Sequence, residues 1–127
     1  MELNEYQKRA MSTCMESSNN FAYMSYGLAG EVGEFMGKIG KYIRKGKVKI
    51  DNNDLIVGNT ETDFLLSKDE ADALIAEIGD CLWFVSGLCT TLGWSLEEIG
   101  QKNLDKLAAR KAAGTIDGNG DGIIREK

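Results

Sequence analysis

The longest regular pattern in the chain lies between residues 67 and 93 and reads SKDEADALIAEIGDCLWFVSGLCTTLG. Ser67 followed by Glu70 is typical of a capping box, in which each side chain satisfies a backbone N–H of the other residue. Behind this box, apolar residues recur at helical spacing until Gly93, and glycine commonly ends helices. The segment therefore predicts one long helix, apolar enough to bury surface against a partner subunit as well as against its own chain.

Three further helices are predicted around this one. Residues 4–17 repeat an apolar residue every four positions after an Asn4–Gln7 capping pattern. Residues 20–45 carry a longer apolar stripe with five interspersed glycines, which suit close approach of a neighbouring helix although each costs ~1 kcal/mol relative to Ala. Ser95 opens a fourth helix that runs to residue 112 and is closed by Gly114.

These segments predict an all-α fold, an antiparallel bundle of four to five helices that oligomerises through helix packing. The chain of 127 residues suits a single domain, which we place at 1–127. Within it, residues 46–66 form an insertion loop, for which a small hairpin and a mobile loop are equally consistent. Residues 115–127 form a tail rich in glycine and charge.

Composition excludes several classes of function. Lys and Arg total 15 against 20 Asp and Glu, and the net charge of −5 is unlike that of a protein that binds nucleic-acid polymers. The chain has no histidine, so catalytic triads and histidine metal sites are excluded. Three cysteines without CxxC spacing indicate the free thiols of a reducing compartment. With no apolar run that spans a bilayer, we expect a cytoplasmic protein without membrane contact.

Two pairs of carboxylates stand at equal spacing on the two longest predicted helices, Glu31 with Glu34 and Glu77 with Asp80. Residues three apart project from one helix face, so antiparallel packing of these helices brings four carboxylates together. Their mutual repulsion is relieved by a hard divalent cation, and all-oxygen ligation favours Mg²⁺, with Mn²⁺ as a possible substitute. Such pairs are also common on solvated helix faces, but each of these adjoins the apolar stripe of its helix.

The order of four segments resembles that of the MazG-like nucleotide pyrophosphohydrolases: GLAGEVGE at 27–34, EIGDCLWF at 77–84, LGWSLEE at 92–98 and KNLDKL at 102–107. This superfamily also contains dimeric dUTPases, dCTP pyrophosphatases and phosphoribosyl-ATP pyrophosphohydrolase. The resemblance covers most of residues 4–118. It implies an all-α homodimer or homotetramer that hydrolyses a nucleoside triphosphate to the monophosphate and pyrophosphate with Mg²⁺, in a role of cleaning the nucleotide pool. The spacer between the carboxylate pairs is longer than is usual in this family.

The resemblance also implies roles for single residues. It assigns four metal ligands: Glu31, Glu34, Glu77 and Asp80. Beside the resemblance, we expect Glu34 or Glu31 to deprotonate the attacking water molecule, since without histidine a carboxylate or a metal-bound hydroxide must serve as base. On the fourth helix, Asn103 and Lys106 contact nucleotide phosphates or sugar. Asn103 is placed on that helix's inner face, where an amide without a hydrogen bond is costly.

Three further residues are candidates for nucleotide binding. Trp83 suits stacking on a base, although an aromatic residue at helical spacing is more often part of a core. Lys41 and Arg44 suit a phosphate-binding rim, although basic residues also gather at helix ends because of the helix dipole. The sequence does not specify which base is bound.

Besides a homologue that has lost catalysis, against which the four intact carboxylates argue, two alternatives to this function stay open. The first is an activity like that of phosphoribosyl-ATP pyrophosphohydrolase at the same carboxylates. The second rests on DGNGDGII at residues 117–124, which matches the first eight positions of an EF-hand calcium loop. That match predicts a non-catalytic helical module that binds calcium or a protein partner, although the loop's final glutamate position falls beyond Lys127.

Overall fold

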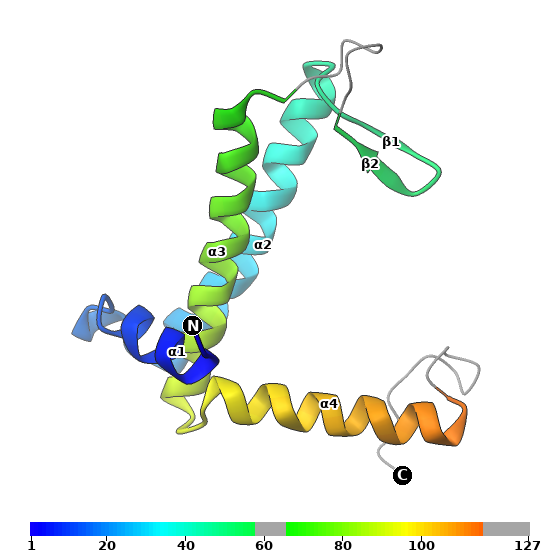
Figure 1. Ribbon diagram of the computed structural model, residues 1–127. Coiled ribbons are helices and arrows are strands. Elements are labelled where there is room, and N and C mark those ends of the chain that lie inside the picture. Colours follow the sequence, from blue (N-terminus) through cyan, green and yellow to red (C-terminus); the bar gives the residue numbers. More distant parts are fainter. Residues whose placement is uncertain (58–65, 116–127) are drawn as a thin grey trace.

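The computed structural model describes residues 1–57 and 66–115, and these residues are mostly helical (Figure 1). Their four α-helices are α1 (Leu3–Met11), α2 (Phe21–Arg44), α3 (Lys68–Thr91) and α4 (Leu96–Ala113). A short 3₁₀ helix spans Glu16–Ser18, and two strands, β1 (Lys49–Asp51) and β2 (Asp54–Ile56), follow α2. The predicted all-α class is confirmed.

The body of the molecule is the antiparallel pair of α2 and α3, which lie side by side along their length (Figure 1). Two glycines allow this approach, because Gly27 of α2 faces the Phe84 ring and Gly87 of α3 faces the Met24 side chain. A Cβ atom at either glycine would overlap the side chain opposite. Met24 is completely buried at this contact. The predicted role of glycine in helix approach is therefore confirmed at Gly27, whereas Gly30 has open space around it.

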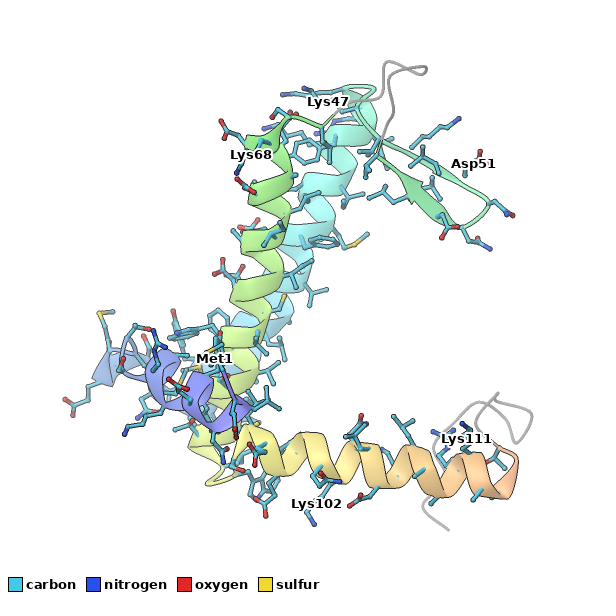
Figure 2. All side chains as sticks on the ribbon, in the orientation of Figure 1. Met1, Lys47, Asp51, Lys68, Lys102 and Lys111 are labelled. Atoms are coloured by element: carbon cyan, nitrogen blue, oxygen red, sulfur yellow. The ribbon has the colours of Figure 1, made fainter. Side chains whose placement is uncertain are left out.

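At the other end of the pair, the beginning of α3 is fixed to the segment that follows α2. The capping box is present as predicted, with Ser67 Oγ accepting from the Glu70 N–H at 3.1 Å and the Glu70 carboxylate accepting from the Ser67 N–H at 2.9 Å. Lys47 Nζ lies 3.0 Å from the same carboxylate. The Ser67 N–H, and next the Lys47 hydrogen bond, hold the pKa of Glu70 below its usual value. Lys47 and Lys68 mark this end of the pair in Figure 2.

The insertion after α2 contains a β-hairpin, so one of its two predicted forms is present. β1 and β2 pair antiparallel with Asp51 opposite Asp54. The turn residues Asn52 and Asn53 have φ angles of 53° and 69°, a left-handed conformation that asparagine tolerates. Residues 58–65 and the calcium-loop pattern at 117–124 lie outside the described residues.

The first helix differs from its prediction at both ends. It begins after Glu2, which makes no side-chain cap, and not at Asn4. It ends at Met11 and not at residue 17. The predicted Asn4–Gln7 capping pair is therefore wrong. Its failure has a physical reason, since the Gln7 amide is used elsewhere.

Gln7 joins α1 to the turn between α3 and α4. Its NH₂ group donates to Thr90 Oγ1 at 2.9 Å and to the Trp94 carbonyl at 3.0 Å, and its carbonyl oxygen accepts from the Leu96 N–H at 2.6 Å. Three hydrogen bonds from one side chain thus hold together segments that are more than eighty residues apart in the sequence.

α4 projects away from the α2–α3 pair (Figure 1). It begins as predicted at Ser95, whose Oγ accepts from the Glu98 N–H at 3.0 Å, and ends at Gly114 with a φ of 76°. Leu96 is its one buried residue among those described. Lys102 and Lys111 extend from this helix in Figure 2. Within one chain, antiparallel packing is thus confined to α2 and α3, with α1 crossing their end and α4 leaving it.

Much of the apolar surface stays uncovered in one chain. Eight hydrophobic residues are buried, whereas eighteen large hydrophobic side chains are exposed among the residues described. Six of the exposed side chains recur at helical spacing and so form one stripe on each helix of the pair. These apolar stripes are Val32, Met36 and Ile43 on α2, and Ile75, Ile78 and Leu82 on α3.

α3 has the length and composition of a membrane-spanning helix, with a mean hydropathy of 1.4 over its most apolar window. The core helix of a globular protein passes the same test. α3 packs against α2 and α1 and carries Glu77 and Asp80 near its centre. Because carboxylates are costly in hydrocarbon, these features favour a core helix.

Candidate metal centre

Three of the four predicted carboxylates converge on one side of the helix pair. Glu31 comes from the middle of α2, and Glu77 and Asp80 come from the middle of α3. One carboxylate oxygen from each of the three lies within 4.8 Å of the others. Glu31 and Glu77 are half-buried, and Asp80 is exposed. The antiparallel pairing brings them together because it places the middles of the two helices side by side.

Glu34 lies at the edge of this cluster. It stands three residues beyond Glu31 on α2, is exposed to solvent, and is outside the group of three whose oxygens approach within 4.8 Å. Its negative charge still acts on Glu31. The fourth predicted ligand is therefore a neighbour of the cluster with its carboxylate facing water.

The cluster has an electrostatic cost in the protein alone. Burial raises the pKa of Glu31 above its usual value, and the negative charges of Asp80, Glu77 and Glu34 raise it further, in that order. Each effect disfavours the ionised form of Glu31. A divalent cation among these oxygens would instead favour the ionised form of Glu31. The donor set, all carboxylate oxygen, fits a hard cation such as Mg²⁺ or Mn²⁺.

α1 borders the cluster and is fastened there by Trp83. The Trp83 indole N–H donates to the Ala10 carbonyl at 3.1 Å and to Thr13 Oγ1 at 3.0 Å. Its ring meets Phe84 edge-on, with centroids 5.0 Å apart. Through these contacts Trp83 fixes α1 to α3. The stacking of Trp83 on a nucleotide base stays a prediction.

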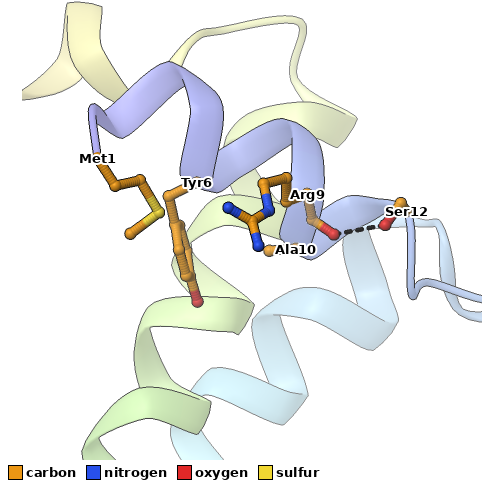
Figure 3. A pocket seen from close by; sticks show the side chains of 5 residues that line it. All are labelled: Met1, Tyr6, Arg9, Ala10 and Ser12. Atoms are coloured by element: carbon orange, nitrogen blue, oxygen red, sulfur yellow. Dashed lines mark hydrogen bonds between the residues drawn. The ribbon is translucent and has the colours of Figure 1, made fainter.

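A cavity of about 550 Å³ opens beside α1, next to this junction (Figure 3). It is lined by Met1, Tyr6, Arg9, Ala10 and Ser12. Burial, and next the charge of Asp80, raise the pKa of the Tyr6 phenol, so this ring lies within electrostatic reach of the carboxylates. Sequence reasoning missed Tyr6 because its position in the apolar repeat of the first helix assigned it to the core.

The remaining predicted residues lie away from the carboxylates of their own chain. Lys41 and Arg44 are exposed near the end of α2, and at 1.5 Å of rise per residue Lys41 is roughly 15 Å along the helix from Glu31. Lys106 is half-buried and Asn103 is exposed on α4. The predicted inner-face position of Asn103 is wrong for a single chain, because α4 leaves the helix pair and that face stays open to solvent.

Comparisons with known proteins bear on this arrangement. A family model described as "MazG nucleotide pyrophosphohydrolase domain" matches residues 20–114, which include both helices that carry the carboxylates. The chain is 31% identical over 128 residues to the "Gene 37 protein" of Mycobacterium phage L5, an alignment that covers 95% of this chain and 98% of the phage protein. No solved structure matches the chain.

Proposed function

Since the chain belongs to the MazG nucleotide pyrophosphohydrolase family, we propose that it hydrolyses a nucleoside triphosphate to the monophosphate and pyrophosphate, with Mg²⁺ as cofactor. The observation that carries this proposal is the approach of Glu31, Glu77 and Asp80 to within 4.8 Å of one another. Members of this family typically depend on a divalent metal. The proposed role is cleaning of the nucleotide pool in the cytoplasm, where the three free cysteines stay reduced.

The residues that would hold Mg²⁺, or Mn²⁺ in its place, are Glu31, Glu77 and Asp80, with Glu34 at the open side. When bound, the cation neutralises charge on the phosphate oxygens and on the departing pyrophosphate. The half-buried position of Glu31 and Glu77 limits the water around this charge and so strengthens its effect.

We assign the role of base to a carboxylate of the site, since the chain has no histidine. Glu34 suits this role best, since it is exposed and stands beside the three converging carboxylates. A water molecule held by Glu34 attacks the α-phosphorus and passes its proton to the carboxylate. The bond from the α-phosphorus to the α–β bridging oxygen breaks, and pyrophosphate leaves. Glu31 is the second candidate for the same step.

The protein would act as a homodimer or homotetramer joined through the apolar stripes. A second copy would cover side chains that are now 40% to 65% exposed, such as Leu82 and Ile75. α4 carries Asn103 and Lys106 away from the carboxylates of their own chain. Their proposed contacts to nucleotide therefore require the meeting of two copies. Contacts of Trp83, Lys41 and Arg44 with nucleotide are part of the same proposal.

The test of the activity is pyrophosphate release with Mg²⁺ across a panel of ribo- and deoxynucleoside triphosphates and phosphoribosyl-ATP. Glu34→Gln and Glu77→Gln should each abolish turnover while the circular dichroism spectrum stays unchanged. Glu97→Gln, which removes an exposed carboxylate from the first turn of α4, is the matched control and should stay active. Full activity of Glu77→Gln would remove this residue from the site, and tight Ca²⁺ binding without turnover of any nucleotide would favour the calcium-binding module.

The test of assembly is the mass in solution by light scattering. Ile75→Lys places a charge within the apolar stripe of α3 and should shift the protein toward the monomer. Ile50→Lys changes an equally apolar residue on the hairpin, 58% exposed and outside the stripes, and should leave the mass unchanged. A monomeric wild type at micromolar concentration would contradict assembly through the stripes.

A further inference from the structure

The cavity beside α1 is held in a defined place relative to the carboxylates. Trp83 binds Ala10 in the last turn of α1 and Thr13 just after this helix, and Trp83 follows Asp80 by less than one helical turn on α3. Gln7 fixes the same helix to the turn that follows α3. The residues of α1 that face the cavity are therefore a fixed wall next to Asp80.

Tyr6 is the aromatic residue of this wall. The charge of Asp80 acts on its phenol. Figure 3 shows the Tyr6 ring reaching from α1 toward α3, with its hydroxyl at the far end. The residue is half-buried, and in the described part of the chain no hydrogen bond of this hydroxyl to protein is found. The hydroxyl is thus available as a donor to a ligand that binds beside Asp80.

Arg9 supplies positive charge on the same wall. Figure 3 shows its guanidinium group in the cavity between Tyr6 and Ala10. Its ion pair with Glu5 is long, at 3.5 Å, and both side chains are mostly exposed, at 72% and 55%. Such a surface pair holds the guanidinium only weakly. Arg9 can therefore turn to an anion that enters the cavity.

The charge balance of the proposed reaction requires a positively charged side chain such as that of Arg9. Four carboxylates stand at or beside the candidate metal centre, and their negative charge would offset most of the charge of a cation bound there. A nucleoside triphosphate brings further negative charge, which burial beside carboxylates makes unfavourable without added cations. A guanidinium binds phosphate oxygens in a bidentate manner, and a phenol donates one further hydrogen bond.

We propose that Arg9 and Tyr6 bind the polyphosphate tail of the substrate in the α1 cavity, so that this wall recognises phosphate and not the base. This inference rests on the proposed function and adds to it the side from which the tail is held. It makes Arg9 a residue that sets affinity for every nucleoside triphosphate alike. Tyr6 contributes the smaller share, because it donates one neutral hydrogen bond.

The experiment compares Arg9→Gln with Lys8→Gln and includes Tyr6→Phe. Lys8 is the neighbouring exposed cation on α1 and is absent from the lining of this cavity, so it matches the charge change. The base-free probe is inorganic tripolyphosphate, and its binding is measured by calorimetry in the presence of Mg²⁺. Arg9→Gln should weaken this binding on the order of tenfold and Tyr6→Phe about threefold, whereas Lys8→Gln should resemble the wild type.

Activity measurements complete the test. The KM of Arg9→Gln should rise by a similar factor for every triphosphate of the panel, with a smaller change in kcat. Equal tripolyphosphate binding by Arg9→Gln and Lys8→Gln in an active protein would overturn this inference and leave the proposed function standing. A rise in KM that depends on the base, with tripolyphosphate binding unchanged, would also overturn it. A wild type that releases no pyrophosphate from any nucleotide would overturn the proposed function itself.

Discussion

Replacement of Gln7 by Ala should destabilise the protein by about 2–3 kcal/mol. Gln7 makes three hydrogen bonds of 2.6 to 3.0 Å to Thr90, Trp94 and Leu96. Each such bond contributes roughly 0.5–1.5 kcal/mol, and two of the three are exposed, which places the sum in the lower part of the range. The loss should appear as a lower midpoint in urea with an unchanged m-value, measured by circular dichroism at one protein concentration.

Two further variants separate the causes of this loss. Gln7→Met keeps the length of the side chain without its hydrogen bonds, and should lose nearly as much stability as Gln7→Ala. Gln101→Ala removes an exposed hydrogen bond to Asp105 at 2.9 Å within α4, and should change stability by less than about 0.5 kcal/mol. If Gln7→Ala costs no more than Gln101→Ala, the reasoning that α1 is held by this side chain is refuted.

Three other predictions concern the helix pair. Ser86→Ala should raise the free energy of unfolding by about 0.5–1 kcal/mol, because the completely buried Ser86 hydroxyl has no hydrogen-bond partner in the described chain; lower stability in urea would contradict this. Gly27→Ala should cost about 1–3 kcal/mol by overlap with Phe84, whereas Gly37→Ala, in open space, should gain up to ~1 kcal/mol; equal effects would refute the packing argument. Because the pKa of Glu70 is lowered on folding, its ionised form stabilises the protein above its unfolded pKa, and this stability is lost as the pH falls through the folded value. The free energy of unfolding in urea should therefore be higher for the wild type than for Glu70→Gln at pH 7, and the two values should converge in acid. A difference that stays constant with pH would contradict the argument.

Local sequence signals were sufficient for the elements that form the candidate site. The Ser67–Glu70 capping box and the apolar repeat behind it define α3, and the apolar stripe of residues 20–45 defines α2. Each carboxylate pair lies near the middle of its helix, so antiparallel packing of the two helices along their length predicts the approach of the pairs. This part of the site depends on helix periodicity, which is a local property.

The errors concern residues whose environment is set by distant parts of the fold. Gln7 fits a local capping pattern, but the turn at Trp94 offers it better hydrogen bonds. Asn103 shares the apolar side of its helix, but exposure depends on what covers that side, and in one chain α4 has left the helix pair. Tyr6 resembles a core residue in the repeat, and its closeness to Asp80 follows from how α1 crosses α3. Such tertiary placement has no signal in the periodicity of a single helix.

The central claim is that Glu31, Glu77 and Asp80 together hold a divalent cation. Its most direct test is titration with Mn²⁺ followed by electron paramagnetic resonance, which measures free Mn²⁺ without any need for turnover. The wild type and Glu97→Gln should bind Mn²⁺ with equal affinity, and Glu77→Gln should bind it at least tenfold more weakly while still folded. Equal binding by the wild type and Glu77→Gln would contradict the claim.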